Sequence, residues 1–144
     1  VYKRQDNVIP ASTSAIVLQL KKLGLLFDKE DYTAIADQLF ANVFPQLKTY
    51  GSAYSNWSIY LLEEVYGSNE IALVGEYATI WRKELDQHYI PNKITLGGTK
   101  SKLPLLLNRQ GIGSKAYLCK NKTCSLPQDS IASILNLLND NGND

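Results

Sequence analysis

The sequence predicts a mixed fold, in which three N-terminal helices precede a small α/β segment with three parallel strands. Up to Gly67, apolar residues recur at spacings of three and four, which is typical of amphipathic helices. After Gly67, short apolar runs flank one amphipathic segment, which is typical of a strand–helix–strand unit. A chain of 144 residues fits one domain or two small halves. We therefore divide it into a helical half, 1–67, and an α/β half, 68–144.

Three helices are expected in the first half. The first opens at Pro10-Ala11-Ser12 and continues to Phe27, with Ser12 or Thr13 as its cap and Pro10 just outside. Ile16, Leu20, Leu23 and Phe27 form one stripe along it. The second spans 32–47 and is bent or stopped near Pro45, because proline cannot donate a helical hydrogen bond. The third spans 54–66 and ends at Gly67.

The second half is expected to hold three strands and two helices. Strands are predicted over 71–74, 93–96 and 115–119, because these runs are short and apolar. A helix over 77–89 joins the first two strands, so those strands should be parallel. A closing helix over 128–138 should turn its apolar residues inward, namely Ile131, Ile134, Leu135 and Leu138.

The carboxyl ends of these strands are the first place where a ligand could bind, because parallel strands present those ends at one edge. If all three strands are parallel neighbours, Glu76 and Cys119 are the ionisable groups of that rim. The competing interpretation is that Gly75 and Gly97-Gly98 only make turns.

Cys119 and Cys124 admit three interpretations. They are two reduced thiols, a local disulfide across a tight turn, or half of a zinc site. Zinc needs four ligands, and His88 is the only histidine, so no metal site is assigned. The Cys-x-x-Cys redox motif is absent.

Composition excludes several functions. The net charge of +1 argues against a broad basic surface for nucleic acids. No apolar run reaches the ~18 residues that a membrane span needs, and the N-terminus lacks an apolar signal core, so a cytoplasmic protein is expected.

Neither Gly-x-Gly-x-x-Gly nor a Walker sequence occurs, so no cofactor is expected. The acidic pairs at 63–64 and 84/86 point to different helix faces, and no catalytic residue is assigned.

Aromatic residues crowd the third predicted helix and the segment before it. Core packing explains them, and a carbohydrate-stacking platform is the alternative. The five rings are Tyr50, Tyr54, Trp57, Tyr60 and Tyr66.

Two stretches carry a family resemblance. They are Asp6-Asn7-Val8-Ile9-Pro10-Ala11-Ser12-Thr13-Ser14 and Ala116-Tyr117-Leu118-Cys119-Lys120-Asn121-Lys122-Thr123-Cys124-Ser125-Leu126-Pro127. With the Val-Gly strand end and Tyr89-Ile90-Pro91-Asn92 between them, the chain resembles the C-terminal region of the thioredoxin-domain-containing proteins that include the spermatogenesis-associated thioredoxin-like proteins.

The resemblance implies a protein of several hundred residues. An N-terminal thioredoxin-like domain would be followed by an (α/α)₆ toroid, similar to N-acylglucosamine 2-epimerases and six-hairpin glycosidases, and by a small α/β segment. The first half of this chain would be the last helices of the toroid. The family's Pro-Ser-x-Asn-Ser pattern has Thr13 in place of its asparagine, whereas Ser14 is retained. The thioredoxin active-site cysteines would lie outside this chain.

Three functions follow as hypotheses, and whether the chain is an enzyme stays open. The first is a structural or docking role against the rest of its own polypeptide, without catalysis by this segment alone. The second is one wall of a sugar-active cavity that binds a carbohydrate through Ser12, Thr13, Ser14 and Trp57. The third is a redox-responsive module that uses Cys119 and Cys124. Helices cut from a toroid should also expose an apolar patch, which a homodimer could cover.

Overall fold

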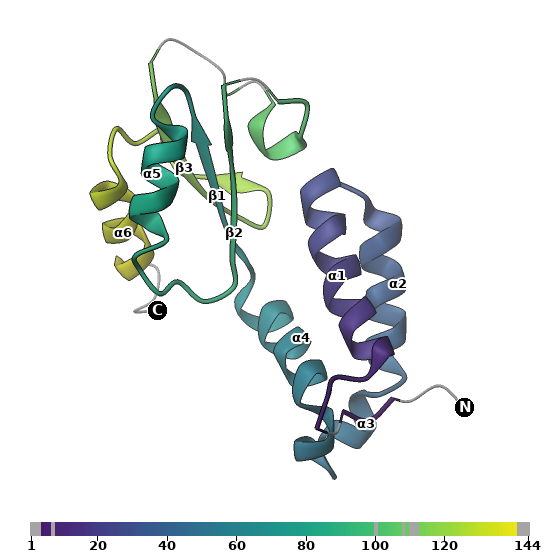
Figure 1. Cartoon of the computed structure of the whole chain (residues 1–144). Helices are drawn as coiled ribbons and strands as arrows, with labels where there is room; N and C mark the ends of the chain where they lie inside the picture. Colours follow the sequence, from purple (N-terminus) through teal and green to yellow (C-terminus); the bar gives the residue numbers. More distant parts are fainter. Residues whose placement is uncertain (1–3, 7, 100, 108, 110–112, 141–144) are drawn as a thin grey trace. The chain divides into compact units, whose positions relative to one another are not determined.

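The computed structural model of the chain describes residues 4–6, 8–99, 101–107, 109 and 113–140 (Figure 1). The chain divides into two compact units, Val1–Tyr66 and Gly67–Asp144.

The N-terminal unit is helical. Its elements are α1 (Ser12–Phe27), α2 (Glu30–Ala41), the short α3 (Phe44–Leu47), a 3₁₀ turn η1 (Gly51–Tyr54) and α4 (Ser55–Tyr66). The helix expected over 32–47 is therefore two helices. Pro45 lies in the first turn of α3, where its missing N–H costs nothing, so the proline starts a new helix after the break.

The core of the N-terminal unit is formed by α1, α2 and α4. Its buried members are Val17, Ala36, Val43, Tyr54, Trp57 and Tyr60. Gly24 lets α1 approach α2, because a Cβ atom there would lie 2.4 Å from Thr33 Oγ1. Three of the five crowded aromatic rings, those of Tyr54, Trp57 and Tyr60, thus serve as core.

The apolar stripe expected on α1 coincides only in part with its buried face, because Leu20 packs against the core whereas the other three members do not. The buried residues of α1 are Ser14, Val17 and Gly24. Ile16, Leu23 and Phe27 lie at least one-third exposed, about a quarter-turn away from Val17. The helical spacing was correct, but α1 carries apolar residues on more than one face, so spacing alone could not say which face is covered.

A buried carboxylate ties the N-terminal segment to two helices. One oxygen of Asp6 accepts hydrogen bonds from Ala11 N at 2.9 Å and Ser14 Oγ at 2.6 Å, and the other accepts from Asn56 N at 3.0 Å. The N-cap residue of α1 is Ala11, and no side chain makes a capping hydrogen bond there, so the expected caps Ser12 and Thr13 are wrong: both lie inside the helix. Burial opposes ionisation of Asp6, but these hydrogen bonds outweigh it and lower its pKa.

The C-terminal unit contains a four-stranded mixed sheet in the order β2-β1-β3-β4. Its strands are β1 (Asn69–Val74), β2 (Lys93–Gly98), β3 (Lys115–Lys120) and β4 (Thr123–Cys124). β1 and β2 are parallel, as the strand–helix–strand pattern predicts, whereas β3 is antiparallel to β1 and β4 is antiparallel to β3. The expected three-stranded parallel sheet is therefore wrong.

The direction of β3 follows from the connection before it. A parallel β3 would need a crossover connection, usually an α-helix, long enough to return the chain to the end of the sheet where β2 begins. The segment after β2 contains only the short 3₁₀ turn η2 (Pro104–Leu106) within its described residues. β2 ends with Gly98 beside Val74, and β3 begins with Lys115 beside the same residue. The chain thus re-enters the sheet at the end where it left, on the other side of β1.

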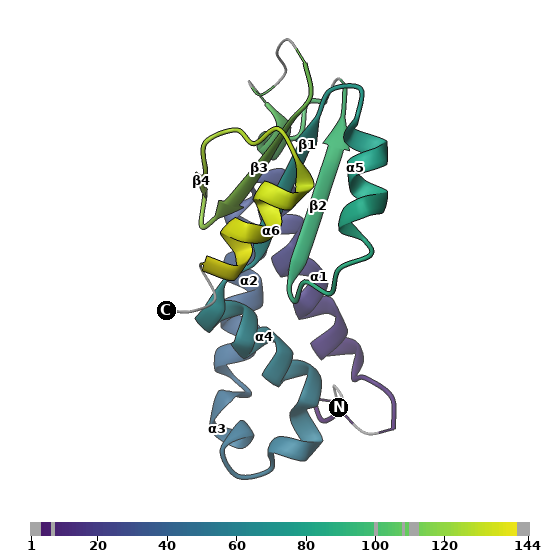
Figure 2. The same ribbon diagram turned by 90° about the vertical axis from the view of Figure 1, so that its left-hand side faces the viewer.

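The two faces of the sheet are covered differently. Helices α5 (Ala78–Leu85) and α6 (Ile131–Asp140) lie on one face, and η2 lies on the other (Figures 1 and 2). The helical side buries Ile71, Leu73, Ala116, Leu118, Ile131 and Ile134, so the inward face expected for the closing helix is confirmed. The opposite side packs Ala72 and Val74 against Leu106. No described helix has the length and apolar character to cross a membrane.

We predict that Asp6→Ala destabilises the N-terminal unit by roughly 3 kcal/mol, because buried backbone donors lose their acceptor. Since the pKa of Asp6 is lowered on folding, its contribution is present above about pH 3.8 and is lost as pH falls through the folded value. Urea unfolding followed by Trp57 fluorescence, in a Trp81→Phe background, measures both effects. Asp31→Ala removes an exposed carboxylate from the same unit and should cost less than about 1 kcal/mol. Equal losses for the two variants would contradict the prediction.

Candidate functional site

The candidate site is built on the β3–β4 hairpin. Asn121 and Lys122 form its two-residue turn, and both have positive φ angles, 50° and 65°. Two such residues are typical of the type I′ turn, whose twist matches that of the flanking strands. The turn pairs Lys120 with Thr123 and therefore sets Cys119 directly across from Cys124.

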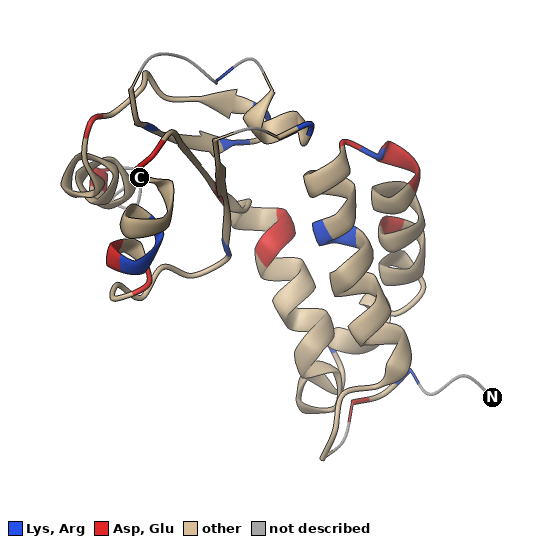
Figure 3. Ribbon diagram, turned by 45° about the horizontal axis from the view of Figure 1, so that its top comes forward, with Lys and Arg blue, Asp and Glu red and all other residues tan. Residues whose placement is uncertain are grey.

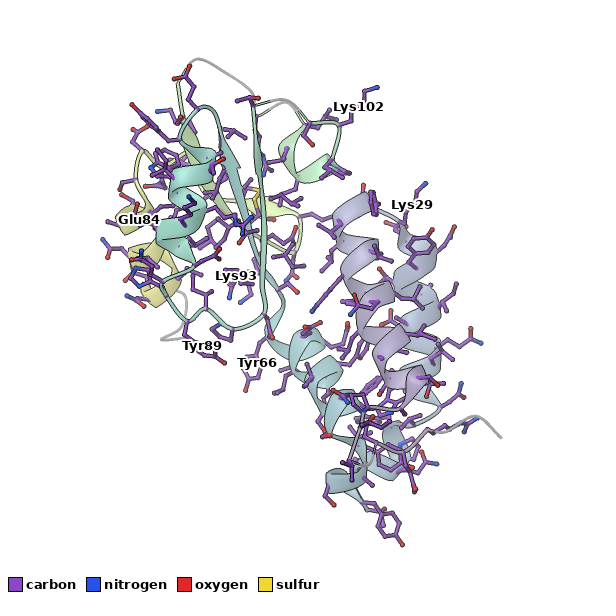
Figure 4. All side chains as sticks on the ribbon, viewed as in Figure 1. Lys29, Tyr66, Glu84, Tyr89, Lys93 and Lys102 are labelled. Carbon is purple, nitrogen blue, oxygen red and sulfur yellow. A yellow bond between two sulfur atoms is a disulfide. The ribbon has the colours of Figure 1, made fainter. Side chains whose placement is uncertain are left out.

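Cys119 and Cys124 form a disulfide across this hairpin (Figure 4). Their Cα atoms lie 3.9 Å apart. Cys119 is buried, with 1% of its surface exposed, whereas Cys124 is half-buried. Of the three interpretations of the cysteine pair, the structure contains the local disulfide. Both sulfurs are used by that bond and are not free to bind zinc.

The guanidinium group of Arg109 brackets the disulfide. Nη1 donates to Cys119 Sγ at 3.1 Å, and Nη2 donates to Cys124 Sγ at 2.7 Å. The same guanidinium lies 5.2 Å from the centroid of the Tyr117 ring, a cation–π distance. Two donors in a fixed plane and one aromatic face hold the positive charge beside both sulfurs. Sequence reasoning missed Arg109, because it lies ten positions before Cys119 in an irregular segment.

A buried carboxyl group lies on the neighbouring strand. Glu70 of β1 is the cross-strand partner of Cys119, and only 8% of its surface is exposed. Directly opposed residues share one face of an antiparallel pair. Burial raises the pKa of Glu70, and the positive charges of Arg109 and Lys122 oppose that rise. An acidic residue next to an apolar run was the available signal, but only the antiparallel register connects it to Cys119.

The predicted strand-end rim is not assembled. It required Glu76 and Cys119 at one edge of a parallel sheet. Glu76 follows the carboxyl end of β1, beside Gly98 and Lys115, whereas Cys119 lies at the opposite end of β1, beside Glu70. The antiparallel direction of β3 separates the two candidates.

The residues predicted to line a sugar cavity lie in the N-terminal unit. Ser12 is exposed and Thr13 is half-buried. Ser14 is buried and donates to Asp6, while Trp57 is buried and donates through Nε1 to Arg4 O at 2.8 Å. Ser14 and Trp57 thus hold the unit together. Their assignment to a cavity stays a prediction.

Two helices of the N-terminal unit carry an outward apolar face. On α1 it consists of Ile16, Leu23 and Phe27, and on α4 of Ile59, Leu62 and Tyr66, all between 38% and 64% exposed. Spacings of 7 and 4, and of 3 and 4, align each set along one side of its helix. Charged residues are sparse on the ribbons of both helices (Figure 3), and Tyr66 points away from α1 and α2 (Figure 4). We call these six residues the outer apolar face.

We predict that the double variant Cys119→Ser/Cys124→Ser lowers the free energy of unfolding of the C-terminal unit by about 2 kcal/mol, because the disulfide closes a short loop. Urea unfolding monitored by circular dichroism measures the change. The reduced wild-type protein should match the variant. A variant as stable as the oxidised protein would contradict the prediction.

We also predict that Glu70→Gln stabilises the protein at neutral pH. Because the pKa of Glu70 is raised on folding, the wild-type protein loses stability as pH rises from about 4.5 through the folded value. The variant should lack this decline, so the two unfolding curves converge at acidic pH. Glu76→Gln, which removes an exposed carboxylate from the same unit, should keep the wild-type pH profile. A Glu70→Gln profile parallel to that of the wild type would refute this assignment.

Comparison with known proteins gives one distant relative. No family model and no solved structure matches the chain. A Caenorhabditis elegans protein named "Uncharacterized protein B0495.5" is 26% identical over 146 residues, which cover 94% of this chain and 20% of that protein. The chain thus spans about one-fifth of the length of the curated relative that it matches.

Proposed function

We propose that this chain is a docking segment of a larger protein of the thioredoxin-domain-containing family, in which its helices continue an α/α toroid. The segment does not catalyse a reaction by itself. Its partner is the rest of its own polypeptide.

The observation that carries this proposal is the outer apolar face. A surface helix of a globular protein normally has one apolar stripe and one polar face, whereas a helix that is apolar all round belongs in an interior. α4 turns Trp57 and Tyr60 inward and Ile59, Leu62 and Tyr66 outward. α1 repeats this arrangement with Val17 inside and Ile16, Leu23 and Phe27 outside.

A helical partner suits these faces best. Residues three, four and seven positions apart present straight ridges, and such ridges pack into the grooves of another helix. The match to one-fifth of a much longer protein supports a partner within the same polypeptide. The carbohydrate alternative gains no such support, because Ser14 and Trp57 are engaged in internal hydrogen bonds.

A second candidate function is a redox-responsive module, and the Arg109-bracketed disulfide favours it. We propose a cytoplasmic location for the protein. Cytosolic disulfides are mostly transient and used in catalysis or redox sensing. The Cys119–Cys124 bond would then open and close in the working protein.

The docking proposal is tested by binding in trans. The coding sequence upstream of Val1 is determined, the helical segment that it encodes is produced separately, and its affinity for this chain is measured by calorimetry. We expect Ile16→Lys/Leu23→Lys to weaken binding at least about 100-fold, because two large apolar side chains lose their burial.

The matched control is Ala34→Lys/Gln38→Lys, which adds two lysines to exposed positions of α2 outside the outer apolar face. This control should bind as the wild type does. Absence of an upstream helical segment, or equal binding by the two variants, would refute the proposal. Sedimentation of the isolated chain separates docking from a homodimer, which the same Ile16 and Leu23 substitutions would dissociate.

A further inference from the structure

We propose that the Cys119–Cys124 disulfide is a thiol-exchange site, in which a small anionic thiol attacks Cys124 and Cys119 leaves as a thiolate held by Arg109. This inference rests on the redox-responsive candidate function and is independent of the docking face.

Access distinguishes the two sulfurs. Cys119 is 1% exposed in the middle of the sheet, between β1 and β4, whereas Cys124 is half-buried on the edge strand. An attacking thiolate must reach one sulfur in line with the S–S bond. Cys124 is therefore the sulfur that accepts the new bond, and the buried Cys119 is the one that departs.

Arg109 suits Cys119 as a leaving group. A hydrogen bond from guanidinium to an anion is stronger than one to a neutral sulfur, so the 3.1 Å contact from Nη1 to Cys119 strengthens as the thiolate forms. The 2.7 Å contact from Nη2 would stabilise a Cys124 thiolate in the same way, so access decides which sulfur leaves and Arg109 sets how fast. A nearby arginine lowers the pKa of a thiol, and a thiol of lower pKa leaves faster. The cross-strand carboxyl of Glu70 opposes this effect least when protonated, and its burial favours that form.

The exchange balances without a further cofactor. The incoming thiolate RS⁻ forms an RS–Sγ bond to Cys124, and the electron pair of the S–S bond leaves with Cys119 Sγ. A second thiolate then attacks the RS sulfur, so that RSSR is released and Cys124 becomes a thiolate. Two thiols are oxidised, and the protein disulfide gains two electrons.

Local charge selects an anionic attacker. Lys122 is exposed in the hairpin turn, and Arg109 lies beside the sulfurs. Both positive charges act on Glu70, the cross-strand partner of Cys119, so they lie close to the disulfide and attract anions at low ionic strength. A small thiol that carries carboxylates, such as glutathione, should therefore react faster than a cationic thiol such as cysteamine.

The test uses the oxidised 144-residue chain and reduced glutathione. Reactions are quenched with acid and alkylated, and trypsin, which cleaves after Lys120 and Lys122, separates the two cysteines for mass spectrometry. We expect the mixed disulfide on Cys124 in at least about tenfold excess over Cys119. Cysteamine, compared at equal thiolate concentration, should react about tenfold more slowly at low salt and nearly equally at high salt.

Two variants test the role of Arg109. Arg109→Gln should slow reduction about tenfold and shift the glutathione equilibrium towards the disulfide, and Arg109→Lys should fall between this variant and the wild type. Lys102→Gln, which removes an exposed positive charge from the same unit, should react as the wild type does. A mixed disulfide on Cys119, or wild-type rates in Arg109→Gln, would overturn the inference even if the disulfide is reducible. A disulfide that millimolar glutathione does not reduce would overturn the redox-responsive function as well.

Discussion

β1 pairs with β2 in parallel and with β3 in antiparallel orientation, and the candidate site of the C-terminal unit depends on this arrangement. Five of the six residues of β1 are buried, because its two faces are covered by α5 and α6 on one side and by η2 on the other. A strand at this position needs a neighbour on each edge to satisfy its backbone groups. β2 supplies one edge in parallel and β3 supplies the other in antiparallel orientation, which brings Glu70 next to Cys119.

The site therefore depends on a long-range register, which local sequence patterns do not encode. Apolar runs located β1, β2 and β3 correctly. They could not give the direction of a strand, because a short buried run has the same composition in a parallel and in an antiparallel strand. The direction of β3 follows from the connection before it, whose described residues contain no crossover α-helix. In the sequence, the only sign of this was a segment without helical periodicity. Asn121-Lys122 was a local signal for the hairpin, because asparagine tolerates positive φ better than most residues. Arg109 had no local signal.

In the N-terminal unit, the sequence predicted the helices but not which of their faces is buried. Periodicity located α1 and α4 and placed Tyr54, Trp57 and Tyr60 in a helix-rich region, yet it assigned the stripe of Ile16, Leu23 and Phe27 to a face that lies exposed. Helices that are apolar on two faces give two valid solutions, and only packing selects one. Here Val17, Trp57 and Tyr60 pack into one core, and the Asp6 carboxylate joins the start of α1 to the start of α4.

The docking proposal concerns the N-terminal unit and the thiol-exchange proposal concerns the C-terminal unit. The two interactions depend on different physical properties. Any partner that removes the apolar side chains of α1 and α4 from water lowers the free energy, so the strength of docking depends on the apolar area that is buried. Thiol exchange at the disulfide depends instead on a particular geometry, in which the planar guanidinium of Arg109 contacts both sulfurs at once. Losing part of the outer apolar face should weaken docking by degrees, whereas removing Arg109 should slow thiol exchange about tenfold. The thiol-exchange proposal therefore does not depend on whether the helices are docked.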